Sequence, residues 1–459
     1  MSRFLLLMMA VLGWSGAAHA AQVAGQWIVT VDRFGSPEYS TLNLVVADRT
    51  LGGDWDGDAV RGTIEGRSLR FTVTDRQGAT YRFEAQQTPA GLIGAADYPD
   101  NNFPDRRLRF AFSARRVPDR PAGGPRIVTF APQDYSNSFS AERAPVATLW
   151  PGDTVRTTTI DSGGIDAAGV TRALFGNPQT GPFFLAGAQQ GDTIAIHIRK
   201  LTPNRDWAES LDTIVSRAIG GSLAAKAGAL GKPIRWRLDR AAGYATPAQP
   251  SDGLAGYRVP LRPMLGGLAL APGFGSPPLS TGDTGRAGGN MDFPEVVAGN
   301  IVYLPVQQPG GLLYLGDAHA VQGDGETSQY ALETSMDVEF RVELIKARSI
   351  AMPRVESPTE LMALGQAGSL DEALRAASTG LIQWLQQDYG LTLSEAAQVL
   401  GTAVRFSVPN LAGRSVGVAA RLDKSLLPAA RRAEAQPARQ AATNAAALSP
   451  TAAAESPGR

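Results

Sequence analysis

The chain has 459 residues, with 43 lysines and arginines against 43 aspartates and glutamates, and it contains no cysteine. The lack of cysteine excludes disulfides and cysteine-based catalysis. The balanced charge offers no electrostatic footprint for a nucleic acid or an anionic membrane, so that a small, neutral substrate suits the chain better than a polyanion.

Residues 1–20 have the order of an export signal. Arg3 supplies a positive start, residues 4–14 an apolar run, and residues 18–20 a small-x-small cleavage site. The apolar run is shorter than the ~20 residues that span a bilayer, and no later segment is apolar enough to do so. We therefore expect a periplasmic or secreted protein that begins near Ala21 and has no membrane span.

Residues 21–117 are predicted to form a separate all-β module, either a sandwich or a barrel. Apolar residues alternate with polar ones, as in Leu69-Arg70-Phe71, and glycine-containing turns follow at short intervals. The acidic run 54–58 with Glu65 imitates a calcium loop, but alanine occupies its glycine position and strands flank it, which favours a solvated hairpin turn. Three prolines and two glycines in 118–125 predict a linker.

Residues 126–428 open with strands and turns, and a glycine- and proline-rich region at 244–290 predicts long loops. Two helices follow: one begins after the capping box at Ser369 and ends at Gly390, and the other begins at Thr392. They are acidic to neutral and lie in an exported chain, which argues against a DNA-binding helix-turn-helix. Residues 429–459 consist mainly of Ala, Arg, Gln, Ser and Pro, a composition typical of a disordered tail.

Several sequence patterns resemble catalytic motifs but lack a necessary partner. The G-x-S-x-G elbow around Ser415 needs a later histidine, and none follows. Ser222 with Lys226 lacks the second serine of serine–lysine amidases, and 218–230 is better predicted as a helix of small residues. His197 lies in an alternating strand, which favours a structural or pocket-lining role over a ligand role.

The segment 288–326 remains as the candidate site. Acidic β-turns alone would explain Asp324 and leave the role of Asp317 open, since Asp-Gly pairs form turns. They do not explain His319, whose position two residues after Asp317 places both side chains on one face of an extended chain. Carboxylates and histidine suit a divalent cation such as zinc, with an open position for water.

The same segment carries a family resemblance. It contains GGNMD at 288–292, YLPV at 303–306 and GDAHAVQGDGE at 316–326, preceded by PGDTV at 151–155 and GNPQTGP at 176–182. This ordered series resembles the acetamidase/formamidase family over roughly 126–428. The resemblance implies a mainly β fold, with a sandwich-like core, a smaller α/β portion and the two late helices. It also implies metal-dependent hydrolysis of short amides with release of ammonia.

The motif positions predict the site residues. We expect Asp292, Asp317 and His319 to bind the metal, which is zinc or alternatively calcium. We expect Glu326 to act as general base and Asn290 to orient the substrate or a ligand carboxylate. Which carboxylate is ligand and which is base stays open, and two further candidates are Asp161 and Asp324.

The module at 21–117 lies outside the resemblance and leaves the substrate open. One alternative is an exported, non-catalytic amide- or sugar-binding protein of the same fold, and another is a hydrolase of a larger amide. The expected partner is a small neutral amide, without nucleic acid, and a homo-oligomer is compatible with the sequence.

Overall fold

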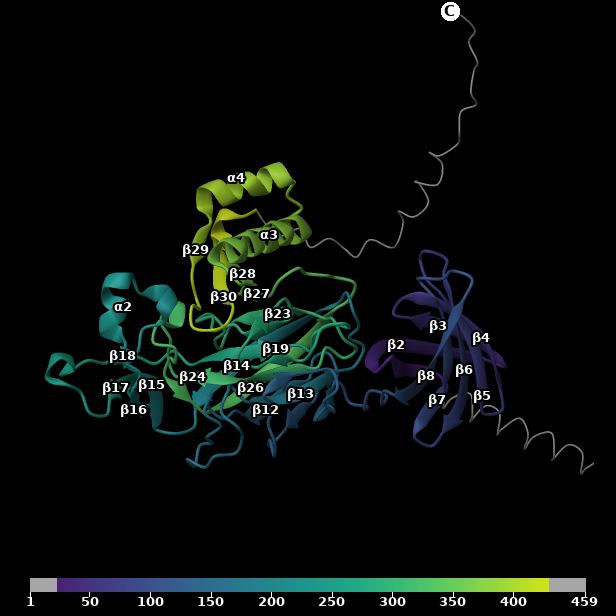
Figure 1. Ribbon diagram of the computed structural model, residues 1–459, viewed down its shortest axis with the longest axis horizontal. Coiled ribbons are helices and arrows are strands. Elements are labelled where there is room, and N and C mark those ends of the chain that lie inside the picture. Colours follow the sequence, from purple (N-terminus) through teal and green to yellow (C-terminus); the bar gives the residue numbers. More distant parts are fainter. Residues whose placement is uncertain (1–22, 429–459) are drawn as a thin grey trace, which may run out of the picture.

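The computed structural model describes residues 23–428 and shows a β-barrel beside a larger, mainly β body (Figure 1). The predicted signal peptide at 1–20 and the predicted tail at 429–459 lie outside the described residues. Within those residues, no helix combines the length and apolarity that crossing a membrane would require.

The N-terminal module is a closed barrel of eight antiparallel strands, in which β1 pairs with both β2 and β8. Trp27, Leu42, Leu69 and Phe83 are among the side chains that fill its interior, so that the barrel encloses a core rather than a channel. The all-β prediction is thus confirmed in its barrel form. The strands are β1 Gly25–Arg33, β2 Ser36–Ala47, β3 Thr50–Trp55, β4 Asp58–Glu65, β5 Ser68–Thr74, β6 Thr80–Thr88, β7 Gly91–Pro99 and β8 Arg107–Arg116.

The acidic run in this module forms the predicted hairpin turn between β3 and β4, where Trp55 pairs with Asp58. Asp54 accepts hydrogen bonds from Gly57 N and from the side chain of Asn43, which is the ordinary chemistry of an aspartate in a turn. Residues 118–125 connect β8 to the body and contain neither helix nor strand. The division of the chain at this segment stays a prediction.

The body contains two large sheets that pack face to face. The first has nine strands in the order β29-β30-β28-β27-β23-β14-β26-β12-β9. Alternation along β14 directs Ile194, Ile196 and Ile198 into the shared core, so that Thr193, Ala195 and His197 belong to the opposite face. The strands are β9 Ile127–Thr129, β12 Thr154–Thr158, β14 Thr193–Pro203, β23 Ile301–Pro305, β26 Met336–Ile345, β27 Arg354–Glu356, β28 Glu360–Ala367, β29 Arg405–Ser407 and β30 Val416–Asp423.

The second sheet has eleven strands and supplies the other side of the core, through residues such as Phe183, Leu265 and Leu315. Its strands are β11 Ala147–Leu149, β13 Gln179–Leu185, β15 Trp207–Leu211, β16 Pro233–Asp239, β17 Tyr244–Pro247, β18 Val259–Pro260, β19 Met264–Ala269, β21 Thr284–Gly285, β22 Gly288–Asn290, β24 Leu313–His319 and β25 Glu333–Thr334. A separate pair joins β10 Ser138–Phe139 to β20 Leu279–Ser280. The predicted sandwich-like core is therefore present.

The two late helices are confirmed as α3 Leu370–Tyr389 and α4 Leu393–Ala403. Ser369 caps the first, which ends at left-handed Gly390, and Thr392 with Glu395 forms a capping box on the second. The first helix, α3, covers the outer face of β28 and β30, and α4 packs against α3, so that both belong to the smaller α/β portion (Figure 1). A short helix, α2 Gly221–Ala227, lies within the predicted 218–230.

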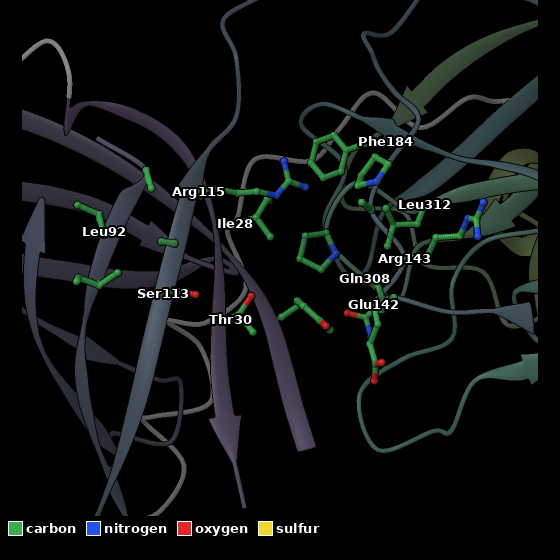
Figure 2. Close-up of a pocket in the computed structure, with 18 residues that line it drawn as sticks. Ile28, Thr30, Leu92, Ser113, Arg115, Glu142, Arg143, Phe184, Gln308 and Leu312 are labelled. Carbon is green, nitrogen blue, oxygen red and sulfur yellow. The ribbon is translucent and has the colours of Figure 1, made fainter. Parts of the chain in front are cut away.

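The barrel and the body meet through a mixed apolar and polar contact. Ile28 of the barrel joins an apolar cluster with Phe184 and Tyr314 of the body, and Gly187 N donates to Oε1 of Gln26. Beside this contact lies a cavity of about 390 Å³, lined from both sides (Figure 2). Its lining includes Arg115, whose guanidinium lies over the ring of Phe184.

Candidate metal centre

A cluster of buried ionisable side chains lies at the end of β24 in the eleven-stranded sheet. It consists of Asp292, Asp317, His319, Glu326 and Glu333, which we call the acidic cluster. Asp317 and His319 come from β24, Glu333 comes from the neighbouring β25, and Glu326 ends the short 3-10 helix η3 Asp324–Glu326. All five are nearly inaccessible to solvent, from 0% for His319 to 6% for Glu326. The structure therefore brings together all four charged residues predicted from the sequence.

Distances within the acidic cluster are those of potential ligands around one centre. His319 Nε2 lies 3.1 Å from Oε1 of Glu333 and 3.5 Å from Oδ1 of Asp317. Candidate ligand atoms of Asp292, Asp317 and His319 lie within 4.8 Å of one another, and so do those of His319, Glu326 and Glu333. His319 belongs to both groups and thus lies between them.

The hydrogen bonds of Gln322 determine the orientation of the His319 ring. Gln322 Nε2 donates to the carbonyl oxygens of Asp292 and Pro409, so that its Oε1 is the atom facing His319 Nδ1 at 2.9 Å. Nδ1 must therefore carry the proton, which leaves the lone pair of Nε2 directed at two carboxylates in a neutral ring. Such an arrangement is repulsive unless a proton or a metal ion lies between them.

Buried polar atoms without a hydrogen-bond partner gather at the same place, around His319 Nε2. Asp292 Oδ1, Asp317 Oδ1, Glu333 Oε2 and His319 Nε2 are all buried and have no hydrogen-bond partner. Leaving a buried polar atom unpaired costs about 1–3 kcal/mol, and more when it is charged. Gly266 preserves the space between the carboxylates, because a Cβ there would lie 2.4 Å from Asp292 Oδ1 and 2.7 Å from Asp317 Oδ2. The unpaired atoms and the cleared space both fit a cation.

The backbone of the cluster is held in an unusual conformation. Asp292, Asp317 and Glu326 all have positive φ, at 43°, 52° and 44°. Residues other than glycine rarely adopt this region, and such strain gathers at functional sites. The side chains of Asp317 and His319 lie close together, as predicted, but the backbone of Asp317 is left-handed and not extended.

A shell of amide side chains orients the carboxylates. Asn290 Nδ2 and Asn410 Nδ2 both donate to Oδ2 of Asp292, at 2.6 and 2.5 Å. Asn177 donates to Oδ2 of Asp317 at 3.1 Å and to Oδ1 of Asn290 at 2.6 Å. These bonds leave the Oδ1 atom of each aspartate as the one without a partner.

Electrostatics within the acidic cluster favour bound cations or protons. Burial raises the pKa of Asp292 and Glu326 well above their usual values, and their mutual repulsion with Asp317 and Glu333 adds to it. Burial also raises the pKa of Glu333, although His319 opposes the shift. Burial alone would lower the pKa of His319, but Glu333 and Asp317 raise it well above its usual value. Four carboxyl groups around one imidazole thus form a strong cation-binding environment.

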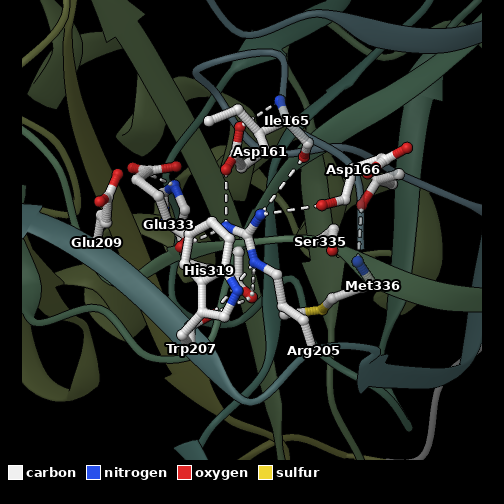
Figure 3. Close-up of polar contacts among 12 residues, drawn as sticks. Asp161, Ile165, Asp166, Arg205, Trp207, Glu209, His319, Glu333, Ser335 and Met336 are labelled. Atoms are coloured by element: carbon white, nitrogen blue, oxygen red, sulfur yellow. Dashed lines mark hydrogen bonds and ion pairs between the residues drawn. The ribbon is translucent and has the colours of Figure 1, made fainter. Parts of the chain in front are cut away.

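The two further candidates from the sequence lie outside the acidic cluster. Asp161 forms a buried ion pair with Arg205 at 2.7 Å, and Arg205 also donates to the backbone carbonyl of Glu333 (Figure 3). Asp161 therefore supports the strand that carries Glu333. Asp324 is exposed on η3, as expected for a residue in an acidic turn.

Sequence reasoning missed four residues that the structure places at the site. Glu333 directly follows the apolar pair Ala331-Leu332, and this is the only local signal for it. Gln322 and Asn177 were visible within the GDAHAVQGDGE and GNPQTGP motifs but were given no role. Asn410 lies far along the chain, and no local pattern connects it to Asp292.

Comparisons with known proteins identify relatives of this chain. The acetamidase/formamidase family model matches residues 275–363. The structure resembles an acetamidase from Yersinia enterocolitica, with a TM-score of 0.58 and 29% identity over 67% of this chain and 94% of that one. The chain thus matches the acetamidase/formamidase family over residues 275–363 and shares its fold with solved acetamidases.

Two other relatives define the extent of the family match. An acetamidase from Bacillus halodurans has a TM-score of 0.56 and 26% identity, over 65% of this chain and 98% of that one. A formamidase from Methylophilus methylotrophus is 33% identical over 137 residues, which cover 25% of this chain and 33% of the formamidase. The chain thus aligns with about a third of this curated relative, and the model match includes Asp292, Asp317, His319, Glu326 and Glu333.

Proposed function

We propose that the protein is a metal-dependent hydrolase of the C–N bond in short linear amides of the formamide and acetamide type. Water and the amide would yield a carboxylate and an ammonium ion, which is in equilibrium with ammonia. The observation that supports this most directly is the convergence of unpaired, buried ligand atoms from Asp292, Asp317 and His319 on one point. The family match supports the reaction class.

In this proposal Asp292, Asp317 and His319 hold the metal, and Glu333, which lies beside His319 in the second group, is an additional candidate ligand. Their oxygen and nitrogen donors fit zinc, with calcium as the alternative. When bound, a divalent ion polarises a carbonyl and lowers the pKa of water towards ~7.

Side chains of the protein carry out the proton transfer and orient the reacting groups. Glu326 accepts a proton from the attacking water and returns it to the leaving amine, as a buried carboxylate with a raised pKa can do. Ala331 N donates to Oε1 of Glu326 at 3.2 Å, which restricts the carboxylate to one orientation. Asn290 holds Asp292 through its amide, consistent with the orienting role expected from its motif.

We also propose that the protein acts outside the cytoplasm, because residues 1–20 have the order of an export signal. The solved acetamidases are covered almost whole by about two thirds of this chain, so that this chain has residues beyond those that match them. Two cavities lie where the barrel meets the body, and neither is lined by a residue of the acidic cluster. These cavities therefore do not favour a larger amide over a short one as the substrate.

The direct test measures ammonia released from formamide, acetamide and propionamide, with and without a chelator. We expect turnover that chelation removes and metal addition restores. Asp317→Ala and His319→Ala should abolish turnover and bound metal together, whereas Asp324→Asn, an exposed neighbour on η3, should change neither. Wild-type-like turnover in either cluster variant would refute the metal assignment. Retained metal without release from any amide would favour the binding protein or a larger substrate.

A further inference from the structure

A cavity of about 380 Å³ lies on the outer face of the nine-stranded sheet, between the sheet and α3. Its floor includes Ala195, Tyr303 and Arg354, which are register partners across β14, β23 and β27. These side chains face away from the core that Ile194 and Ile196 fill. The cavity includes His197, which confirms the pocket-lining role expected for that residue, and none of the acidic cluster.

Arg354 is the buried cation of this cavity and is only 2% exposed. Its guanidinium lies 5.0 Å from the centre of the Trp384 ring and donates through Nη2 to Oε1 of Gln383 and Gln387, at 3.1 and 2.9 Å. Both glutamines donate in turn to the carbonyl of Ser349, which directs their oxygens towards Arg354. The partners found for Arg354 among the described residues are thus neutral, and its Nε has none.

The carboxylates around the cavity are neutralised by other cations. Asp388 forms an ion pair with Arg348, and Glu343 with Arg341. Glu356 forms an ion pair with Lys424 at 2.7 Å and accepts the Tyr303 hydroxyl at 2.7 Å.

The positive charge of Arg354 is consequently left without compensation. Burial, with Arg348 nearby, lowers the pKa of Arg354 to about 9. A buried charge of this kind is destabilising unless an opposite charge accompanies it. Arg354 lines an open volume into which such a charge could enter.

We propose that this cavity binds a small organic carboxylate, with its charged group on Arg354 and a short apolar body against the walls. Ile301, Ile345, Ile350 and Leu361 provide those walls. The planar guanidinium matches a carboxylate in geometry, and the apolar walls favour a hydrocarbon tail over inorganic phosphate. The site is separate from the acidic cluster and does not depend on the proposed amidase activity.

Calorimetric titration of the full chain with benzoate, butyrate, inorganic phosphate and benzyl alcohol tests the proposal. We expect saturable binding of the two carboxylates and none of benzyl alcohol, which lacks the charge. Arg354→Gln should weaken benzoate binding about tenfold or more, because it removes a charge-assisted hydrogen bond. Arg405→Gln is the matched control, since Arg405 is an exposed arginine on β29 of the same sheet.

Three results from the wild type and the Arg354→Gln variant would overturn the proposal. One is the absence of carboxylate binding by the wild type, and another is tighter binding of phosphate than of benzoate. The third is folded Arg354→Gln protein that binds benzoate like the wild type, which would place the carboxylate elsewhere, such as on a metal. Ile345→Trp provides a second variant, because it fills the cavity and keeps Arg354. Loss of benzoate binding in that variant supports the site, and unchanged binding refutes it.

Discussion

Two groups of buried charges lie side by side in the body, and they are built on opposite principles. Asp161 and Arg205 neutralise each other at 2.7 Å, and Arg205 donates further to Thr334 Oγ1 and to backbone carbonyls (Figure 3). The acidic cluster combines four carboxyl groups with one imidazole and leaves several atoms unpaired. Burial and charge are therefore common to both groups, and the converging unpaired ligand atoms distinguish the acidic cluster.

The difference has a physical basis in what each group needs. A buried ion pair is stable when both charges have partners, and removing either partner is strongly destabilising. The acidic cluster is incomplete in itself, because its carboxyl groups repel one another and its histidine lone pair faces two of them. A bound cation would remove this repulsion, so that substitutions should affect stability at one group and chemistry at the other.

The largest expected effect is on turnover, in Glu326→Gln. Glutamine keeps the shape and the acceptor for Ala331 N, but it cannot take a proton from water. We expect bound metal to remain and turnover to fall by about 10²–10⁴. Metal analysis together with ammonia release measures both quantities on the same sample.

The control for this variant makes the same chemical change at an exposed position. Glu372→Gln lies in the first turn of α3, and it should leave turnover unchanged. Should Glu326→Gln lose metal as well as turnover, Glu326 would be a ligand instead of the base.

A large effect on stability, without a loss of metal, is expected for Asp161→Asn. The substitution leaves Arg205 buried without its carboxylate, which typically costs about 3–5 kcal/mol. Chemical denaturation should show this loss, while the folded fraction keeps its metal. The comparison is Glu339→Gln, which breaks the more exposed pair with Arg156 and should cost about 1 kcal/mol or less. Loss of metal at unchanged stability would place Asp161 in the metal site, against its observed pairing.

The contrast between the two groups also shows what the sequence could predict. Local signals were enough to predict the strands, both late helices and the barrel as one of two forms of the N-terminal module. These signals are the alternation of apolar residues, the turns and the helix caps. Asp292, Asp317, His319 and Glu326 followed from a compact motif.

Long-range contacts determined the features that were missed. Glu333 reaches His319 through the pairing of β25 with β24, and Asn410 reaches Asp292 from 118 positions away. The left-handed backbone at Asp317 and Glu326 likewise has no local signal, since neither is a glycine. The neutralisation of Asp161 by Arg205, 44 residues later, could not be read locally either.

Asp56 in the barrel provides a third case, a half-buried carboxyl group for which the described residues provide no ion-pair partner. Burial raises its pKa from 3.8 to about 6, although a hydrogen bond from Thr41 N opposes the shift. Since the folded state then holds the proton more tightly than the unfolded state, the barrel gains stability as pH falls through about 6. The gain is complete below 3.8, and above about 6 the ionised group destabilises the barrel in full.

Asp56→Asn should therefore stabilise the barrel at about pH 8, by about 1 kcal/mol once partial exposure is allowed for. Asparagine keeps the acceptor for Thr41 N and tolerates the left-handed φ of 50° at this position. Hydrogen exchange of β2 and β3 peptides, compared with the wild type at each pH, measures the difference directly.

Asp48→Asn is the control, because Asp48 is exposed in the preceding hairpin with a φ of 56°. A gain that is independent of pH, or equal in the control, would attribute the effect to the turn and not to the buried charge. A gain confined to higher pH would show that an unpartnered carboxylate destabilises even where no metal site exists, which leaves the convergence of several ligand atoms as the distinguishing mark of the acidic cluster.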